Sequence, residues 1–325
     1  MIALSKRYRC LAAAAPLIFA LVSVASAQAP YPSRTITLVL PFAAGSGTDT
    51  TTRIISKELG AALGVGMVID NKAGANGSIA ASYVARSAPD GYTLFVTTNT
   101  THSANPYLLK TMSYDPIKDF TPIARTGDLP FMLVIHPDIP VNSVAELIAL
   151  AKKEPGKYSY ASGSSSAIVS GATFARLAGI DLLHVPYKSS PPALTDVIAG
   201  RVSMMFIDVP TGLPHVNAKA LNALAVTTKK PSALLPHLPT MDHTVKGFDI
   251  TSWQGYLGPA NMPKDIVVKL NAEIRKVIER PDIKNQLAER GMEAFSGTPE
   301  EFDAFLKEQL VLWEKLIADA GIEKQ

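Results

Sequence analysis

The chain has 325 residues, of which 47% are hydrophobic and 18% are charged, so it is long enough to form two globular domains. Three of its 31 lysines and arginines lie in the first 27 residues, which hold no acidic residue, and the rest of the chain carries basic and acidic residues in equal number. This balance argues against a nucleic-acid-binding protein, which needs a basic face.

The first 27 residues have the pattern of a secretory signal peptide. Lys6, Arg7 and Arg9 form a basic start, residues 11–24 are apolar but too few to span a membrane, and 25–27 are a small-residue cleavage site. The only cysteine precedes the apolar run, so the mature chain has none and forms no disulfide. No later stretch is apolar for long enough to span a bilayer. The sequence therefore predicts an exported protein, cleaved after Ala27.

The first part of the mature chain reads as a strand, a turn and a helix. Residues 35–40 are β-branched and aliphatic, 42–49 are small and glycine-rich, and 50–63 place apolar residues on one helical face. The first N–H groups of such a helix are unpaired and carry the positive end of its dipole, so they can bind an anion. The alternative is an ordinary strand-to-helix connection without a ligand.

Strands and helices then alternate, which predicts a parallel sheet with helices on both faces. Strands are expected at 67–70 and 92–97, and a helix at 77–87. The polar loop 97–105 follows the third strand, and ligands of open parallel sheets bind at that edge, so Thr98 and Asn99 are candidate ligand contacts.

After an irregular, proline-broken stretch at 114–125, the second half of the chain repeats the order of strand, polar loop and helix. The small polar loops 162–166 and 208–213 each follow a strand and open a helix, which makes Asp208 a further candidate. A capping box at Thr298 and Glu301 starts the last helix, whose aromatic residues have core spacing. Further strands are expected at 131–136, 157–161, 182–187, 203–207, 221–227 and 253–259, and helices at 143–153, 191–200 and 263–280.

Motifs of common enzymes and of metal sites are missing from the sequence. There is no G-x-S-x-G elbow and no Walker loop, and the sequence GSGTDT at 45–50 lacks the third glycine of a dinucleotide fingerprint. The six histidines are scattered, and His184 within an apolar strand is expected to be structural. We therefore expect no catalytic residue, no metal and no cofactor. The loops that remain can bind a carboxylate through hydroxyls and backbone N–H groups.

Several ordered stretches resemble the Bug family, the periplasmic solute receptors of tripartite tricarboxylate transporters. They are PSRTITLVLPFAAGSGTD at 32–49, VIDNKAGANGSIAA at 68–81, APDGYTL at 88–94, YDPIKDFTPI at 114–123, HVPYKSSPPALTDVIAGRVSMMF at 184–206, LNALAVTT at 221–228, LPTM at 238–241 and SWQGYLGPANMP at 252–263. The resemblance covers nearly the whole mature chain.

The resemblance implies an α/β periplasmic binding protein of type II-like fold, with two doubly wound lobes joined by a hinge. Lobe 1 would comprise 31–128 and 254–325, and lobe 2 would comprise 129–253. It also implies that the protein is a monomer that binds a di- or tricarboxylate, an aromatic acid or an acidic amino acid. Its membrane partner would be an integral-membrane permease.

The family's two ligand loops can be transferred by position. The first falls on Phe42, Ala43, Gly45, Ser46, Gly47, Thr48 and Asp49, and the second on Ser162, Gly163, Ser164, Ser165 and Ser166. Many relatives have a longer second loop followed by a histidine, whereas here Ile168 holds the nearest position. We expect the Phe42 ring to face the ligand. We expect Asp49 to be structural, the alternative being that it accepts a hydrogen bond from a ligand amine or hydroxyl.

Three hypotheses follow for the function. The leading one is a non-catalytic receptor for a small organic carboxylate, which delivers its ligand to a tripartite tricarboxylate-type permease. The second is an exported α/β hydrolase that uses a serine of 162–166. The third is a ligand sensor that presents itself to a membrane kinase.

Overall fold

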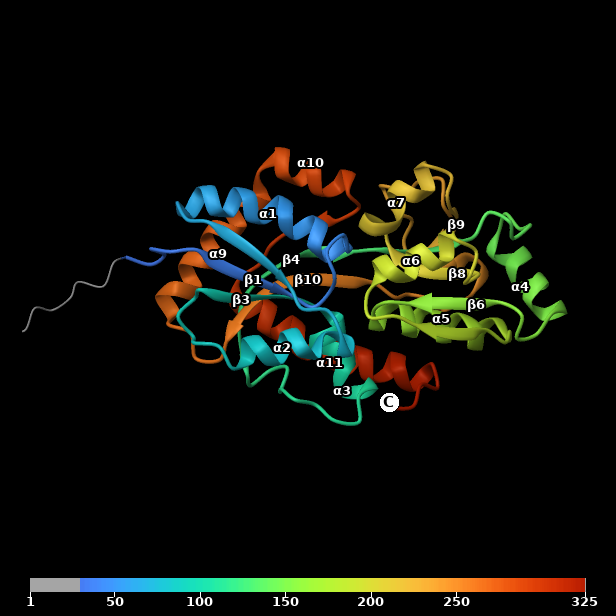
Figure 1. Ribbon diagram of the computed structural model, residues 1–325, viewed down its shortest axis with the longest axis horizontal. Coiled ribbons are helices and arrows are strands. Elements are labelled where there is room, and N and C mark those ends of the chain that lie inside the picture. The colour runs from blue at the N-terminus through green and yellow to red at the C-terminus, as the bar shows by residue number, and fades with distance from the viewer. Residues whose placement is uncertain (1–29, 325) are drawn as a thin grey trace, which may run out of the picture. The chain divides into compact units, whose positions relative to one another are not determined.

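Two mixed sheets, each covered by helices, make up the computed structural model, which describes residues 30–324 (Figure 1). The signal peptide predicted for 1–27 lies outside the described residues. Both sheets belong to one compact unit that begins at Tyr31. We name the part built on the six-stranded sheet lobe 1 and the part built on the five-stranded sheet lobe 2. None of the described helices is long and apolar enough to cross a membrane.

The sheet of lobe 1 has the strand order β11-β4-β10-β3-β1-β2. Strands β1, β2 and β3 are parallel, as predicted, but β10 is antiparallel to both β3 and β4. The bounds are β1 Ile36–Leu40, β2 Met67–Asn71, β3 Thr93–Thr98, β4 Phe120–Leu129, β10 Ser252–Pro259 and β11 Glu293–Ala294.

The sheet of lobe 2 has the order β7-β6-β8-β5-β9. Here β6 is parallel to β7 and β8, whereas β5 is antiparallel to β8 and β9. The parallel sheet predicted from the first hundred residues is therefore confirmed for β1, β2 and β3, and the antiparallel strands all lie later in the chain. The chain enters lobe 2 between β4 and β5 and returns just before β10, so two crossings join the lobes. The bounds are β5 Phe131–Ile135, β6 Ser159–Ser162, β7 Leu183–Pro186, β8 Met204–Asp208 and β9 Asn222–Val226.

Most helices begin where sequence signals place them. The last one has the predicted capping box, in which Thr298 accepts from the N–H of Glu301 and Glu301 accepts from the N–H of Thr298. The first helix starts at Gly47, three residues earlier than predicted. The bounds are α1 Gly47–Leu63, α2 Ser78–Ala85, α3 Asn105–Leu108, α4 Val144–Lys153, α5 Ser165–Ala178, α6 Ser190–Ile198, α7 Val209–Asn217, α8 Met241–Thr244, α9 Lys264–Glu279, α10 Pro281–Glu289 and α11 Pro299–Asp319, with short helical turns η1 Ala75–Gly77 and η2 Thr100–Ala104.

Two segments that were expected to lack regular structure form a strand and a helical turn. The stretch 114–125 was expected to be irregular, but β4 begins at Phe120 and pairs with β10 along its length. Pro122 fits because it lies next to a register shift in this pairing, where a missing N–H costs no ladder hydrogen bond. The loop expected at 97–105 is the π-helical turn η2, and it is buried. Its His102 is enclosed by aromatic rings, and burial lowers the pKa of His102 to about 3.

The C-terminal helix α11 contributes to two hydrophobic clusters. Phe302 and Leu306 pack in a cluster with β1 and β3 residues of lobe 1. Trp313 and Ile317 pack in a cluster that is mostly made of lobe 2 residues. The aromatic residues of this helix are thus core residues, as predicted. The lobe boundaries at 128, 129, 253 and 254 stay a prediction.

Candidate functional site

The start of α1 is held rigidly by its own side chains. Ser46 caps the helix by accepting from the N–H of Asp49 at 3.3 Å. The Asp49 carboxylate accepts from the guanidinium of Arg53 at 2.9 Å to each oxygen, from the N–H of Gly45 at 3.0 Å and from Asn71 at 3.1 Å. Burial raises the pKa of Asp49, but these hydrogen bonds outweigh it and bring the pKa below its ordinary value. Asp49 therefore fastens the loop 42–49 and has no oxygen left over for a ligand.

Four helix N-termini meet at one small cavity between the lobes. Lobe 1 contributes the start of α1, and lobe 2 contributes the starts of α5, α6 and α7. The cavity volume is about 20 Å³, which leaves room for about one water molecule and not for an organic acid. A ligand therefore requires the lobes to move apart. The lining residues are Phe42, Ser46, Gly47, Thr48, Thr100, Leu129, Phe131, Ser164, Ser190, Asp208 and Ser252.

The four helix starts direct partial positive charges and N–H groups toward a cavity that has no lysine or arginine in its lining. Each helix start carries a partial positive charge and unpaired N–H groups. In the described part of the chain, the N–H groups of Gly47, Thr48, Ser166 and Ser190 donate to no protein group. Six lining residues add hydroxyl groups. Such a site can bind an anion by hydrogen bonds from fixed donors.

Three hydrogen bonds join the two lobes around this cavity. The N–H of Ala43 donates to Ser189 at 3.1 Å, the amide of Asn99 donates to Ser166 at 2.8 Å, and the N–H of Ser165 donates to Thr100 at 3.3 Å. Asn99 also accepts from Ser252 at the start of β10. Its side chain is thus already paired and connects lobe 1, lobe 2 and the returning crossing.

Ser189 is free to reach across because of the prolines that follow it. An N-cap side chain normally accepts from the second or third N–H of its helix. In α6 those positions are Pro191 and Pro192, which have no N–H. The Ser189 hydroxyl makes no capping hydrogen bond and instead accepts from the N–H of Ala43 in the loop 42–49 of lobe 1.

Asp208 differs from Asp49 in having no cationic partner. It ends β8 and caps α7, and its Oδ1 accepts from the N–H and the hydroxyl of Thr211 at 3.0 and 2.6 Å. Among the described residues no donor is recorded for Oδ2. Burial raises the pKa of Asp208. The Asp208 carboxyl group packs directly against the start of α1, since a Cβ atom added to Gly47 would overlap it.

The apolar part of the lining comes from Phe42, Leu129 and Phe131. Phe42 is 8% exposed and belongs to none of the four hydrophobic clusters of the described chain. Its ring therefore lines the cavity and is not part of these clusters. Leu129 and Phe131 flank the crossing between β4 and β5, so closure brings the crossing itself against the cavity.

The predicted site residues fall into two groups. Phe42, Ser46, Gly47, Thr48, Ser164 and Asp208 line the cavity. Ala43, Gly45, Asp49, Thr98, Asn99, Ser162, Gly163, Ser165 and Ser166 lie in the same loops but do not line it. Sequence reasoning missed Ser190, Thr100, Leu129, Phe131 and Ser252.

Ser162 has a histidine partner that the sequence did not reveal. Its hydroxyl lies 2.6 Å from Nε2 of His184, whose ring stacks on Tyr160. This pairing satisfies His184, in keeping with the structural role expected for it. In the part of the chain that the structure describes, no carboxylate pairs with His184 to complete a triad, and Ser162 does not line the cavity. The geometry does not favour a hydrolase.

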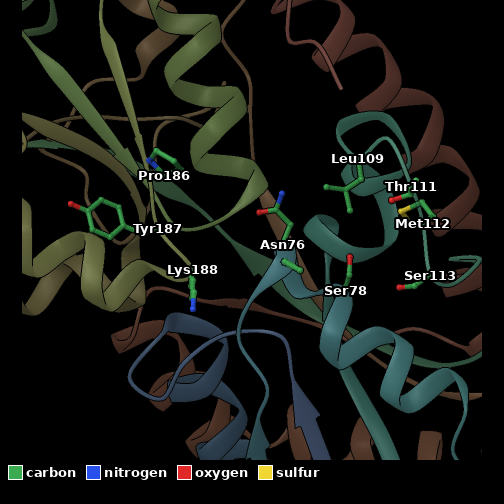
Figure 2. A pocket seen from close by; sticks show the side chains of 10 residues that line it. Asn76, Ser78, Leu109, Thr111, Met112, Ser113, Pro186, Tyr187 and Lys188 are labelled. Atoms are coloured by element: carbon green, nitrogen blue, oxygen red, sulfur yellow. The ribbon is translucent and has the colours of Figure 1, made fainter. Parts of the chain in front are cut away.

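A wider groove of about 770 Å³ lies elsewhere and contains none of the predicted residues. Figure 2 shows Asn76 and Ser78 near its middle, with Tyr187 and Lys188 to one side and Thr111 and Ser113 to the other. Its only charged lining residue is Lys188. Between residues 30 and 324, no group of three or more histidine, cysteine or acidic side chains could hold a metal ion.

Comparison with known proteins identifies relatives along most of the chain. Residues 51–322 match the family model described as "Tripartite tricarboxylate transporter family receptor". The structure of Rpa4515 from R. palustris with adipate is similar, with a TM-score of 0.89 and 36% identity over 91% of this chain and 100% of that one. The periplasmic binding protein BugD has a TM-score of 0.87 and 33% identity, and covers 91% of this chain and 100% of its own. MatC from Rhodopseudomonas palustris with bound malate has a TM-score of 0.81 and 29% identity, over 88% and 100% of the two chains.

These similarities confirm the family resemblance seen in the sequence. They also confirm the fold class, since the similar structures are periplasmic binding proteins with two lobes that are joined by a hinge. With the family model matching well over half of its residues, the chain belongs to the receptor family of the tripartite tricarboxylate transporters.

Proposed function

We propose that the protein is a non-catalytic periplasmic receptor that binds a small organic carboxylate between its lobes and delivers it to a tripartite tricarboxylate-type permease. The observation that carries this proposal is the convergence of four helix N-termini and several hydroxyls on one cavity without a lysine or arginine. Carboxylates are among the anions that such fixed donors bind. The similar structures with adipate and malate support the same ligand class.

The mechanism is closure of the lobes around the ligand. The closed cavity is too small to admit a ligand, so entry requires opening. A ligand that hydrogen-bonds to α1 in lobe 1 and to α5 and α6 in lobe 2 stabilises the closed form, because only that form makes both sets of contacts. The permease would then recognise the closed receptor. The mature protein would begin after Ala27 and act as a monomer, with lobe 1 formed by 31–128 and 254–325 and lobe 2 by 129–253.

The proposal is tested by ligand screening on refolded, ligand-free protein. Aliphatic di- and tricarboxylates, aromatic acids and acidic amino acids are compared with their methyl esters by thermal shift and calorimetry. Free acids should raise the melting temperature and their esters should not, because the esters lack the anionic oxygens. Ester hydrolysis by the wild type and by Ser162→Ala is measured in parallel. Stabilisation by no acid, or turnover lost in Ser162→Ala, would contradict the proposal.

A further inference from the structure

The cavity contains one ionisable side chain, the carboxyl group of Asp208, and its surroundings leave one oxygen unused. Asp208 is 7% exposed. Both of its recorded hydrogen bonds come from Thr211 and end on Oδ1. In the described chain no lysine or arginine stands beside it, and no donor is recorded for Oδ2. Because Asp208 lines the cavity and its Oδ2 has no donor within the protein, a donor group on a bound ligand is the natural partner of that oxygen.

The charges in the cavity indicate which kind of ligand group would donate a hydrogen bond to Oδ2 of Asp208. The starts of α1 and α7 favour the ionised form of Asp208, whereas burial opposes it. A ligand carboxylate placed in the same cavity adds a second negative charge and repels the first. A ligand ammonium group near Asp208 relieves that repulsion and fills the free oxygen. A ligand hydroxyl fills the oxygen but leaves the charge uncompensated.

We infer that Asp208 is the specificity-determining residue of the site and selects carboxylates that carry a hydrogen-bond donor, with an ammonium group preferred over a hydroxyl. This inference rests on the proposed function and assigns to Asp208 the role that the sequence left open for Asp49. Asp49 cannot fill it, because its two oxygens are occupied by Arg53, Gly45 and Asn71.

The test uses acids that differ only in one substituent. Succinate, malate and aspartate carry hydrogen, hydroxyl and ammonium at the same carbon, and the series glutarate, 2-hydroxyglutarate and glutamate repeats this with one more methylene. Dissociation constants are measured by calorimetry at pH 7 for the wild type, Asp208→Asn and Asp138→Asn. Asparagine keeps the cap of α7, because Asn and Asp cap helices equally well. Asp138→Asn makes the same charge change on an exposed residue of lobe 2.

In the wild type the amino acid should bind about tenfold or more tightly than the unsubstituted acid, as expected for a hydrogen bond between charged groups. Asp208→Asn should weaken binding of the amino acid and tighten binding of the unsubstituted acid, so that the preference shrinks or reverses. Asp138→Asn should keep the wild-type order.

Equal wild-type affinity for the three substituents would overturn the inference and leave the proposed function standing. A preference that persists in Asp208→Asn would do the same. If no carboxylate bound at all, the proposed function would fail and the inference with it. The wild-type comparison needs no variant, so the inference stays testable even if Asp208→Asn folds poorly; Asp208→Ser, which also keeps an N-cap side chain, then replaces it.

Discussion

Two buried aspartates stand at helix starts beside the cavity, and their environments are opposite. Asp49 on α1 accepts four hydrogen bonds, two of them from the guanidinium of Arg53, and its pKa lies below the ordinary value although burial alone would raise it. Asp208 at the start of α7 accepts two, both from Thr211, and burial raises its pKa. The helix start is common to both, so the partners of each carboxylate decide whether it is structural or available to a ligand.

The two lobes also differ in how the loops beside the cavity are held. In lobe 1 the loop 42–49 is fixed by hydrogen bonds within its own lobe. In lobe 2 the hydroxyls of Ser166 and Ser189 accept hydrogen bonds from lobe 1 donors. Lobe 1 therefore presents a preformed surface, and lobe 2 supplies groups whose partners change when the lobes open.

The largest effect on this arrangement is expected from Gly47→Ala. Position 47 is the first residue of α1, where alanine suits the helix, but its Cβ would overlap the Asp208 carboxyl group and lie 3.2 Å from Cβ of Pro210. Overpacking of about 1–3 kcal/mol would arise only in the closed form, so affinity should fall by about 5- to 150-fold. The ligand-free melting temperature should not fall.

Calorimetry and thermal unfolding check this prediction. Gly66→Ala is the control, since it adds a methyl group beyond the other end of α1 against the side chain of Thr35. It should leave affinity unchanged. Wild-type affinity in Gly47→Ala would show that the ligand is bound without the close approach of Asp208 to α1.

The second expected effect is on stability and comes from Asp49→Asn. Removing the charge breaks the hydrogen bonds with Arg53 and should lower the free energy of unfolding by about 1–3 kcal/mol, while the order of ligand preference stays that of the wild type. Because the folded pKa of Asp49 is below its unfolded value, this contribution is complete above pH 4 and is lost as the pH falls through the folded pKa.

Urea unfolding at pH 7 and near pH 3 measures this difference. The gap between wild type and Asp49→Asn should be clear at pH 7 and shrink in acid. A selective loss of affinity for amino acids over their deaminated analogues in Asp49→Asn would instead make Asp49 the ligand-facing carboxylate.

The third prediction distinguishes a role of Phe42 in lining the cavity from a role in the hydrophobic core. Phe42 lines the cavity outside the hydrophobic clusters, so Phe42→Ala should keep the ligand-free melting temperature and weaken binding by about tenfold. The loss should be larger for flat aromatic acids than for short aliphatic ones. Phe206→Ala, in the core of lobe 2, should instead cost about 3–5 kcal/mol of stability. A comparable loss of stability in Phe42→Ala would place its ring in the core.

The parts of the fold that were predictable are those with local signals. A strand followed by a glycine-rich turn located α1, and Thr298 with Glu301 located the start of α11. β4 was missed because Pro116 and Pro122 suggested broken structure, and the register shift that accommodates Pro122 depends on β10, more than 120 residues away. The antiparallel strands were missed for the same reason, since pairing is not local.

The candidate site divides in the same way. Ser46, Gly47, Ser164 and Asp208 were found because each begins a helix directly after a strand or turn. Leu129, Phe131 and Ser252 could not be found, because only the crossings between the lobes bring them to the cavity. Ser189 and Ser190 did carry a signal, since a serine followed by two prolines cannot cap its own helix and is free to bond elsewhere.

The smallest expected effect compares two serines of α5. Ser165 and Ser170 are both fully buried, and neither hydroxyl has a hydrogen-bond partner in the described chain. Ser165 is the first residue of the helix, next to the lining residue Ser164, and its N–H bonds to Thr100 across the lobes. Ser170 lies more than one turn further along.

Ser46→Ala would also be expected to weaken binding, but it removes the cap of α1. Loss of this cap lowers the free energy of unfolding by about 1 kcal/mol, so the variant would mix two effects.

Ser165→Ala removes a hydroxyl that no protein group uses, so stability should stay the same or rise slightly. If that hydroxyl turns to a ligand carboxylate when the lobes close on it, affinity should fall about two- to tenfold, as for one hydrogen bond of about 0.5–1.5 kcal/mol. Ser170→Ala makes the same change in the same helix and should leave affinity at the wild-type value. Titration calorimetry of both variants with one acid decides the matter, because equal affinities in the two would mean that the start of α5 contributes its N–H groups alone.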